Sequence, residues 1–120
     1  MICDASIPTY MLTHWARDRV RGERLPLQFV VKKQTKDTAN LYGLGDRGSL
    51  EVGLRADINV IDFENLRLNS PWMAHDLPAG GRRLLQDADG YDFTIVAGQV
   101  TRDHGQDTGA RPGRLVRGAR

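Results

Sequence analysis

The sequence predicts an α+β fold in which helices come first and short strands follow. Apolar residues recur with a helical period over about the first 43 positions, and the pattern changes to the alternation typical of strands after Gly43. No alternation of strand and helix and no internal repeat is present, which argues against a parallel sheet. We therefore expect helices over residues 1–43, and β strands with irregular connections and a basic tail over residues 44–120.

Two helices are expected in the first part. Pro8 suits the first turn of a helix, where its missing N–H costs nothing, and the apolar pattern then continues to Arg21, before Gly22. Pro26 repeats this arrangement and opens a second helix that runs to Leu41, with a break allowed for near residues 35–37. Gly43 is placed to cap that helix.

Short strands are expected in the second part. Residues 57–62 alternate polar and apolar side chains, residues 84–86 form a brief candidate, and residues 91–97 are rich in aromatic and β-branched side chains. Ala97-Gly98 is a plausible two-residue turn into a further strand over residues 99–102. The stretch around Pro71 and Pro78 is interpreted as a long irregular connection, and residues 103–113 as a loop.

Composition excludes several classes of protein. Hydrophobic residues make up 40% and charged residues 27% of 120 positions, which is ordinary for a globular domain and argues against disorder and against a membrane protein. The net charge of +2 is too small to imply a nucleic-acid partner. Cys3 is the only cysteine, so no intrachain disulfide can form, and residues 1–11 lack the features of a leader peptide. We expect a cytoplasmic protein.

Residues that could carry hydrolytic chemistry do not gather in the sequence. His14, His75 and His104 are isolated from one another, without the close pairs that begin most metal sites. We expect His14 to be a helix histidine and the other two to be solvated loop residues. Cys3 is expected to be a small buried thiol, and no histidine or nucleophile-elbow glycine lies near Ser6.

Charged and glycine-rich segments are possible ligand sites. Arg17-Asp18-Arg19 is expected to form surface ion pairs rather than an anion site. Gly43-Leu44-Gly45 and Gly80-Gly81 do not stand between a strand and a helix, so a phosphate-binding loop is disfavoured. The basic tail is expected to be solvated or docked on acids of the same protein, and its arginines are Arg111, Arg114, Arg117 and Arg120.

Four segments resemble the carboxyl-terminal end of amidohydrolase-superfamily enzymes of the N-acyl-D-amino-acid deacylase (D-aminoacylase) type. The resemblance covers nearly the whole chain, and its most specific parts are the GLGDRGSLEVGLRADINVID junction and the DLPAGGRRL stretch. The four segments are LTHWARDR (12–19), KQTKDTANLYGLGDRGSLEVGLRADINVID (33–62), DLPAGGRRLLQDADGYDFTIVAGQV (76–100) and TGARPGRLVRG (108–118).

This resemblance implies an α+β fragment made of the last helices of a TIM-type (β/α)8 barrel and short antiparallel strands of a small β-rich domain. It implies a hydrolase of non-peptide C–N (amide) bonds that uses Zn²⁺ in the complete enzyme to activate water, with N-acyl-D-amino acids as substrates. The family's metal ligands have no counterpart here, and Asp4 does not match the ligand aspartate. We therefore expect no catalytic or metal residue in this chain. His14 and Arg17 match the family's HWxRD motif, which we interpret as helix packing.

Three hypotheses follow from the sequence. In the first, the chain is a carboxyl-terminal fragment of such an amidohydrolase and is inactive alone. In the second, it is a non-catalytic assembly piece that completes a barrel on a separate chain. In the third, it is a small basic binding module that acts through its arginine tail. No nucleic-acid or membrane partner is expected.

Overall fold

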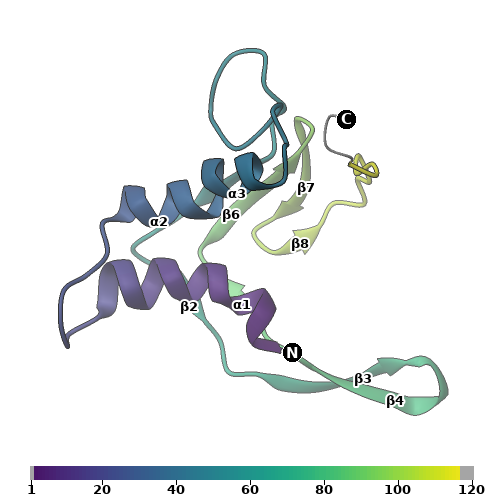
Figure 1. Ribbon diagram of the computed structural model, residues 1–120. Coiled ribbons are helices and arrows are strands. Elements are labelled where there is room, and N and C mark those ends of the chain that lie inside the picture. Colours follow the sequence, from purple (N-terminus) through teal and green to yellow (C-terminus); the bar gives the residue numbers. More distant parts are fainter. Residues whose placement is uncertain (1, 117–120) are drawn as a thin grey trace.

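The computed structural model describes the backbone of residues 2–116 and the side chains of residues 6–116. Helices come first along the chain and antiparallel strands follow, which confirms the predicted α+β class for these residues (Figure 1). The helical elements of the first part are α1 (Ile2–Tyr10), η1 (Met11–Asp18), α2 (Leu27–Gln34) and α3 (Lys36–Leu41). The later elements are β1 (Ile58–Ile61), β2 (Arg67–Leu68), β3 (Trp72–Leu77), η2 (Pro78–Gly80), β4 (Gly81–Leu85), β5 (Ala88–Asp89), β6 (Tyr91–Val96), β7 (Gln99–Asp103) and β8 (Gln106–Asp107).

The first helix differs from its prediction at both ends. It begins at Ile2, so that Pro8 lies inside α1, and it ends at Asp18 rather than Arg21. Proline has a helical φ, but it cannot donate a backbone hydrogen bond and its ring crowds the carbonyl four residues earlier, so the turn before Pro8 lacks one helical hydrogen bond. Its second half, η1, is wound as a π-helix, and the chain turns extended at Arg19 (φ −59°, ψ 125°).

The second helical segment matches its prediction. It is broken at Thr35 (φ −118°, ψ −88°) into α2 and α3. Gly43 follows α3 with a φ of +67°, the left-handed conformation that glycine adopts most readily after a helix.

The largest sheet contains four strands in the order β1-β6-β7-β8, all antiparallel. Its central hairpin confirms the expected turn, since Ala97 and Gly98 have φ values of +51° and +77° between β6 and β7. The loop predicted over residues 103–113 is wrong for residues 103–107 and confirmed for residues 108–113, which have no regular secondary structure. His104 and Gly105 also have positive φ values, +45° and +80°, and they close a second tight hairpin onto β8.

The irregular connection predicted around Pro71 and Pro78 is also wrong. This segment forms the β3–β4 hairpin, which extends away from the rest of the molecule (Figure 1). Pro71 precedes β3 and Pro78 lies in the connecting turn η2, so neither proline removes a donor from the strand ladder. The strand expected at residues 84–86 begins earlier, at Gly81. The remaining two strands, β2 and β5, pair with each other in an antiparallel ladder.

The core is small and joins the two parts of the chain. Leu12 of η1, Val30 of α2 and Leu66 of the segment between β1 and β2 form one buried cluster. The whole chain exposes 9109 Å², whereas a compact 13.4 kDa protein is expected to expose about 6,500 Å². The radius of gyration of 16.2 Å is likewise larger than the about 14 Å expected for 120 residues. Much apolar surface therefore remains uncovered in this chain.

Candidate functional site

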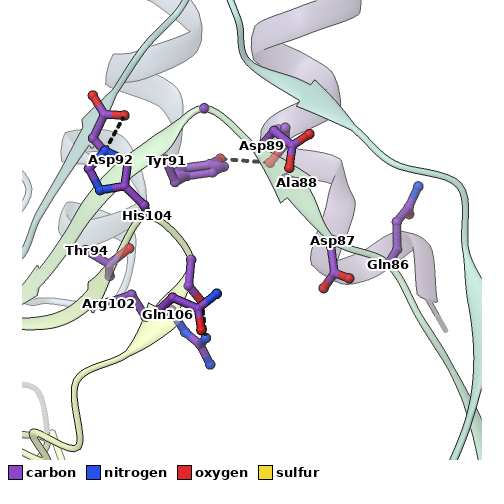
Figure 2. A pocket seen from close by; sticks show the side chains of 13 residues that line it. Gln86, Asp87, Ala88, Asp89, Tyr91, Asp92, Thr94, Arg102, His104 and Gln106 are labelled. Carbon is purple, nitrogen blue, oxygen red and sulfur yellow. Dashed lines mark hydrogen bonds and ion pairs between the residues drawn. The ribbon is translucent and has the colours of Figure 1, made fainter.

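A concave surface opens between the β5–β6 segment, the β7–β8 hairpin and the end of α1. Its volume is about 840 Å³, and Figure 2 shows its polar side chains around an open centre. The charged residues that line it are Asp87, Asp89, Asp92, Arg102 and His104. A concave surface that gathers several polar and charged side chains is a candidate functional site.

Local backbone geometry shapes the floor of this surface. Gly90 joins β5 to β6 with a φ of +94°, and a Cβ built there would lie 2.6 Å from the Cα of Leu66. Only glycine permits this close approach. Gly90 also accepts a hydrogen bond from the Asp62 N–H at 2.9 Å, and Tyr91 Oη shares a hydrogen bond of 2.8 Å with Thr9 Oγ1 of α1. The helix is thereby tied to the wall of the concavity.

His104 lies between two carboxylates on one side of the surface. Its Nδ1 is 2.6 Å from Asp103 Oδ1, and its Nε2 is 3.8 Å from Asp92 Oδ1. The ring also meets the edge of Phe93, with ring centroids 5.5 Å apart. The hydrogen bond to Asp103 raises the pKa of His104 above its ordinary value, and the charges of Asp103 and Asp92 act in the same direction.

The other carboxylates of the surface also have partners. Arg67 donates to Asp89 at 2.9 Å, and Asn69 donates to the same carboxylate at 3.2 Å. These contacts, Arg67 first, lower the pKa of Asp89. Asp87 accepts a hydrogen bond from the indole N–H of Trp72 at 3.2 Å. These contacts bind and orient the charges of the surface within the chain.

The side chains present do not fit the zinc that the family resemblance implies. Within residues 6–116, no three His, Cys, Asp or Glu side chains gather in a way that could hold a metal ion. His104 and its two carboxylates form hydrogen-bonded ion pairs instead. The expectation that this chain carries no catalytic or metal residue stays a prediction.

The three histidines have different surroundings. His14 is half-buried on η1, stacked on Tyr10 at 4.9 Å and edge-on to Trp15 at 5.5 Å, as expected for a helix histidine. His104 is exposed in the β7–β8 turn. His75 does not lie in a loop but in β3, which corrects the prediction for that residue.

The remaining candidate residues show no catalytic grouping. The side chains of Cys3 and Asp4 lie outside the described residues, so the prediction of a buried thiol is untested, and Ser6 is half-buried. Gly43 ends a helix, and Gly80-Gly81 close the β3–β4 hairpin. Neither glycine segment leads into a helix.

Arg17 has a structural role that sequence patterns show only in part. Its guanidinium pairs with Asp18, as expected, and Nη2 donates to the Leu66 carbonyl at 2.8 Å. Nη1 donates to the carbonyls of Phe63 and Glu64. Arg17 therefore fastens the first helix to the segment after β1, in agreement with its interpretation as a packing residue. The HWxRD motif pointed to a structural role of Arg17. The carbonyl groups that it binds could not be predicted from the sequence, because they depend on the fold.

Arg19 does not join the Arg17–Asp18 pair. Its guanidinium lies over the Trp15 ring, 4.5 Å from the centroid, and donates to the Arg21 carbonyl. In the tail, Arg111 docks on Asp107 with two hydrogen bonds of 2.9 and 2.7 Å, as expected for a tail held by acids of the same protein. This contact lowers the pKa of Asp107 to about 2. Arg117 and Arg120 lie outside the described residues.

None of the described helices combines the length and the apolar character needed to cross a lipid bilayer.

Comparison with known proteins shows the family to which the chain belongs. It is similar to the N-acyl-D-glutamate deacylase of Alcaligenes xylosoxydans xylosoxydans, with 36% identity over 73 residues. That match covers 61% of this chain and 14% of the deacylase, so the chain corresponds to a small part of the length of this curated relative. No solved structure matches. The sequence profile of the amidohydrolase family matches residues 1–102, and this chain belongs to that family.

Proposed function

We propose that this chain forms part of a metal-dependent amidohydrolase that hydrolyses the amide C–N bond of N-acyl-D-amino acids. The observation that carries the proposal is the family match over residues 1–102, together with the similarity to a protein named as an N-acyl-D-glutamate deacylase. In this proposal the helices are the last helices of a TIM-type barrel, and the strands belong to a small β-rich domain. The Zn²⁺ of such an enzyme would be held by residues that are not part of this chain.

The exposed apolar side chains of the helices support this placement. Ile7, Tyr10, Phe29 and Val31 have relative exposures of 52%, 45%, 49% and 45%. Phe29 and Val31 are two positions apart and lie on different sides of α2, so this helix exposes apolar side chains on more than one side. Large exposed apolar surface often marks a place where a partner or another part of a protein binds. A barrel would cover these helices. We expect the 120-residue chain alone not to hydrolyse the substrate, because no group of side chains within residues 6–116 could hold the metal ion.

A chimera tests the proposed role directly. The segment of the N-acyl-D-glutamate deacylase that matches this chain is replaced by the corresponding residues, and release of D-glutamate from N-acetyl-D-glutamate is measured, with the L-enantiomer as control. We expect a soluble chimera that retains stereoselective hydrolysis. A soluble, folded chimera without activity would contradict the proposal.

A second assay tests the inactivity of the chain alone. The purified chain is incubated with N-acetyl-D-glutamate and ZnCl2, and free amine is measured. We expect no hydrolysis above the background of zinc alone. Turnover that a chelator abolishes and that is confined to the D-enantiomer would show that the chain holds a site of its own.

The exposed helix faces equally favour a second candidate function, in which the chain is a non-catalytic piece that completes a barrel on a separate chain. The test is co-expression with a polypeptide that carries the metal-ligand half of an amidohydrolase and is encoded beside it. Co-purification with restored hydrolysis would support this candidate, and independent migration of the two chains would count against it. The basic binding module is less supported, because Arg111 is already paired with Asp107.

A further inference from the structure

Three arginines border one hollow near the end of the described chain. Arg55 precedes β1, while Arg111 and Arg114 come from the segment after β8, and all three line a cavity of about 460 Å³. Ala97 of the β6–β7 turn and Gln99, the first residue of β7, also line it. Segments that are far apart in sequence thus bring three arginines to the border of one hollow.

The hollow contains donors and no acid among its described lining residues. The neighbouring Asp57 is already engaged, because it accepts hydrogen bonds from Arg47 at 2.9 Å, from the Nε of Arg55 at 3.0 Å and from the Ala97 N–H at 2.8 Å. Asp107 is likewise held by Arg111. Each of these carboxylates lies outside the lining of the hollow.

Donors remain that no acid of the described chain satisfies. Within residues 6–116, the side chain of Arg114 has no hydrogen-bond or ion-pair partner, and only the Nε of Arg55 donates to a protein acceptor. The side-chain amide of Gln99 adds a neutral donor at the same rim. Guanidinium groups present paired N–H donors in a planar fork that matches carboxylate and phosphate oxygens.

We propose that this hollow binds a small oxyanion, a carboxylate or phosphate group, with Arg55 and Arg114 as its ligands, while Arg111, held on Asp107, forms part of the wall. The inference goes beyond the deacylase proposal and does not rest on it. An anion there would be held between the segment that leads into β1, the β6–β7 turn and the carboxyl-terminal segment. Binding would therefore also order the segment after β8 against the sheet.

Calorimetric titration with inorganic phosphate, and separately with succinate, tests the proposal. The full 120-residue chain is kept in solution as a fusion with a carrier protein that is also titrated alone. We expect saturable binding of at least one of the two anions, weakened by added NaCl as screening increases. The two titrations distinguish a phosphate site from a carboxylate site.

Two variants test the residues of the hollow, each with a matched control. Arg114→Gln is expected to weaken binding about tenfold, because it removes a charge-assisted contact, while Arg82→Gln on β4 leaves it unchanged. Gln99→Glu supplies a carboxylate to the guanidinium groups and is expected to abolish binding without unfolding the chain. The same change at the exposed Gln28 of α2 should have no effect.

Several outcomes would overturn the proposal. These are the absence of saturable binding for both anions, equal losses in Arg114→Gln and Arg82→Gln, or unchanged binding in Gln99→Glu.

Discussion

Gly90 lies where the backbone of β5–β6 passes closest to the segment after β1. A Cβ at this position would lie 2.6 Å from Leu66 Cα and 2.9 Å from Leu66 N, so backbone would have to move. Gly53 offers a matched comparison, because its φ of +93° is almost that of Gly90 but nothing lies within 4 Å of its Cβ position. Substitutions at the two glycines therefore distinguish the effect of a steric clash, expected only at Gly90, from the effect of backbone strain, expected at both.

We expect Gly90→Ala to be far more disruptive than Gly53→Ala. The Gly53 variant suffers only the left-handed strain of a residue with a Cβ, about 1–2 kcal/mol, and its loop is solvent-exposed. The Gly90 variant adds a clash against buried Leu66 and should open the β1–β6 contact. Amide hydrogen exchange at residues 58–66 measures this difference. Equal protection in both variants would contradict the role assigned to Gly90.

His104 predicts a pH dependence for the β7–β8 hairpin. Its pKa is raised in the folded chain, first by the hydrogen bond to Asp103 and then by the charges of Asp103 and Asp92. Protonated His104 therefore stabilises the hairpin below the ordinary histidine pKa of about 6.5, and this stabilisation is lost as the pH rises through the raised value. Phe93, against which the ring packs, does not titrate.

The prediction is tested by the protection of residues 99–107 from amide exchange across neutral pH, corrected for the intrinsic exchange rate. We expect protection to fall as the pH rises in the unmodified chain. His104→Asn should remove this dependence, since asparagine tolerates the positive φ of this turn. His75→Asn on β3 is the control and should keep it. A pH dependence that survives His104→Asn would assign the effect to another group.

At the scale of elements, the attachment of the first helix depends on Arg17. Its guanidinium donates to the carbonyls of Phe63, Glu64 and Leu66, and its side chain is 21% exposed. Hydrogen bonds to a charged donor contribute about 1.5–3 kcal/mol each when they are shielded from water. The packing of Leu12 and Val30 on Leu66 stabilises the same junction.

We expect Arg17→Met to loosen this junction while leaving the helix itself formed. Methionine keeps the aliphatic volume but removes every donor to the three carbonyls. Exchange of the amides of residues 63–66 should accelerate about 10- to 100-fold, in line with the loss of one or two charged hydrogen bonds. Arg21→Met, an exposed position beyond η1, should change it little. Unchanged exchange in Arg17→Met would mean that the apolar cluster alone holds the helix.

The elements also show where sequence patterns succeed. The break at Thr35, the cap at Gly43 and the Ala97-Gly98 hairpin were all predicted, because each depends on the conformational preferences of one or two residues. The β3–β4 hairpin was missed, because Pro71 and Pro78 lie just outside its strand ladder. A proline excludes a strand only where the ladder needs its N–H.

At the scale of the whole molecule, the exposed apolar surface determines how the chain behaves alone. Its accessible surface is well above that of a compact protein of its mass, and the buried cluster is small. Side chains such as Leu27, Phe29 and Val31 on α2 remain more than one third exposed. Such surface favours self-association or a partner.

We expect the isolated chain to aggregate or to be partly disordered, without a sharp cooperative thermal transition. Analytical ultracentrifugation across a concentration series and calorimetric melting test this prediction. Double replacement of Phe29 and Val31 by serine should reduce self-association, and replacement of the polar Gln28 by serine should not. A monomer with a cooperative melt would contradict the expectation and would weaken the proposal that these helices belong against a barrel.

The absence of a local signal for the candidate site has a physical explanation. The contacts that build the concave surface and its support join distant residues, such as Thr9 with Tyr91 and Arg17 with Phe63. No local propensity encodes such pairs. His104 illustrates this, because its own turn was interpreted as a loop, and its pairing with Asp92 required β6 and β7 to be neighbours.

The sequence by itself determined the order of helices before strands, the main turns and the family, since these follow from period, from glycine conformation and from motifs that lie within short segments. The tertiary structure alone decided which carbonyls Arg17 binds, how Gly90 meets Leu66, and that Arg55, Arg111 and Arg114 share a hollow. These features depend on the approach of segments that are far apart in the chain, and only packing of the whole fold sets that approach.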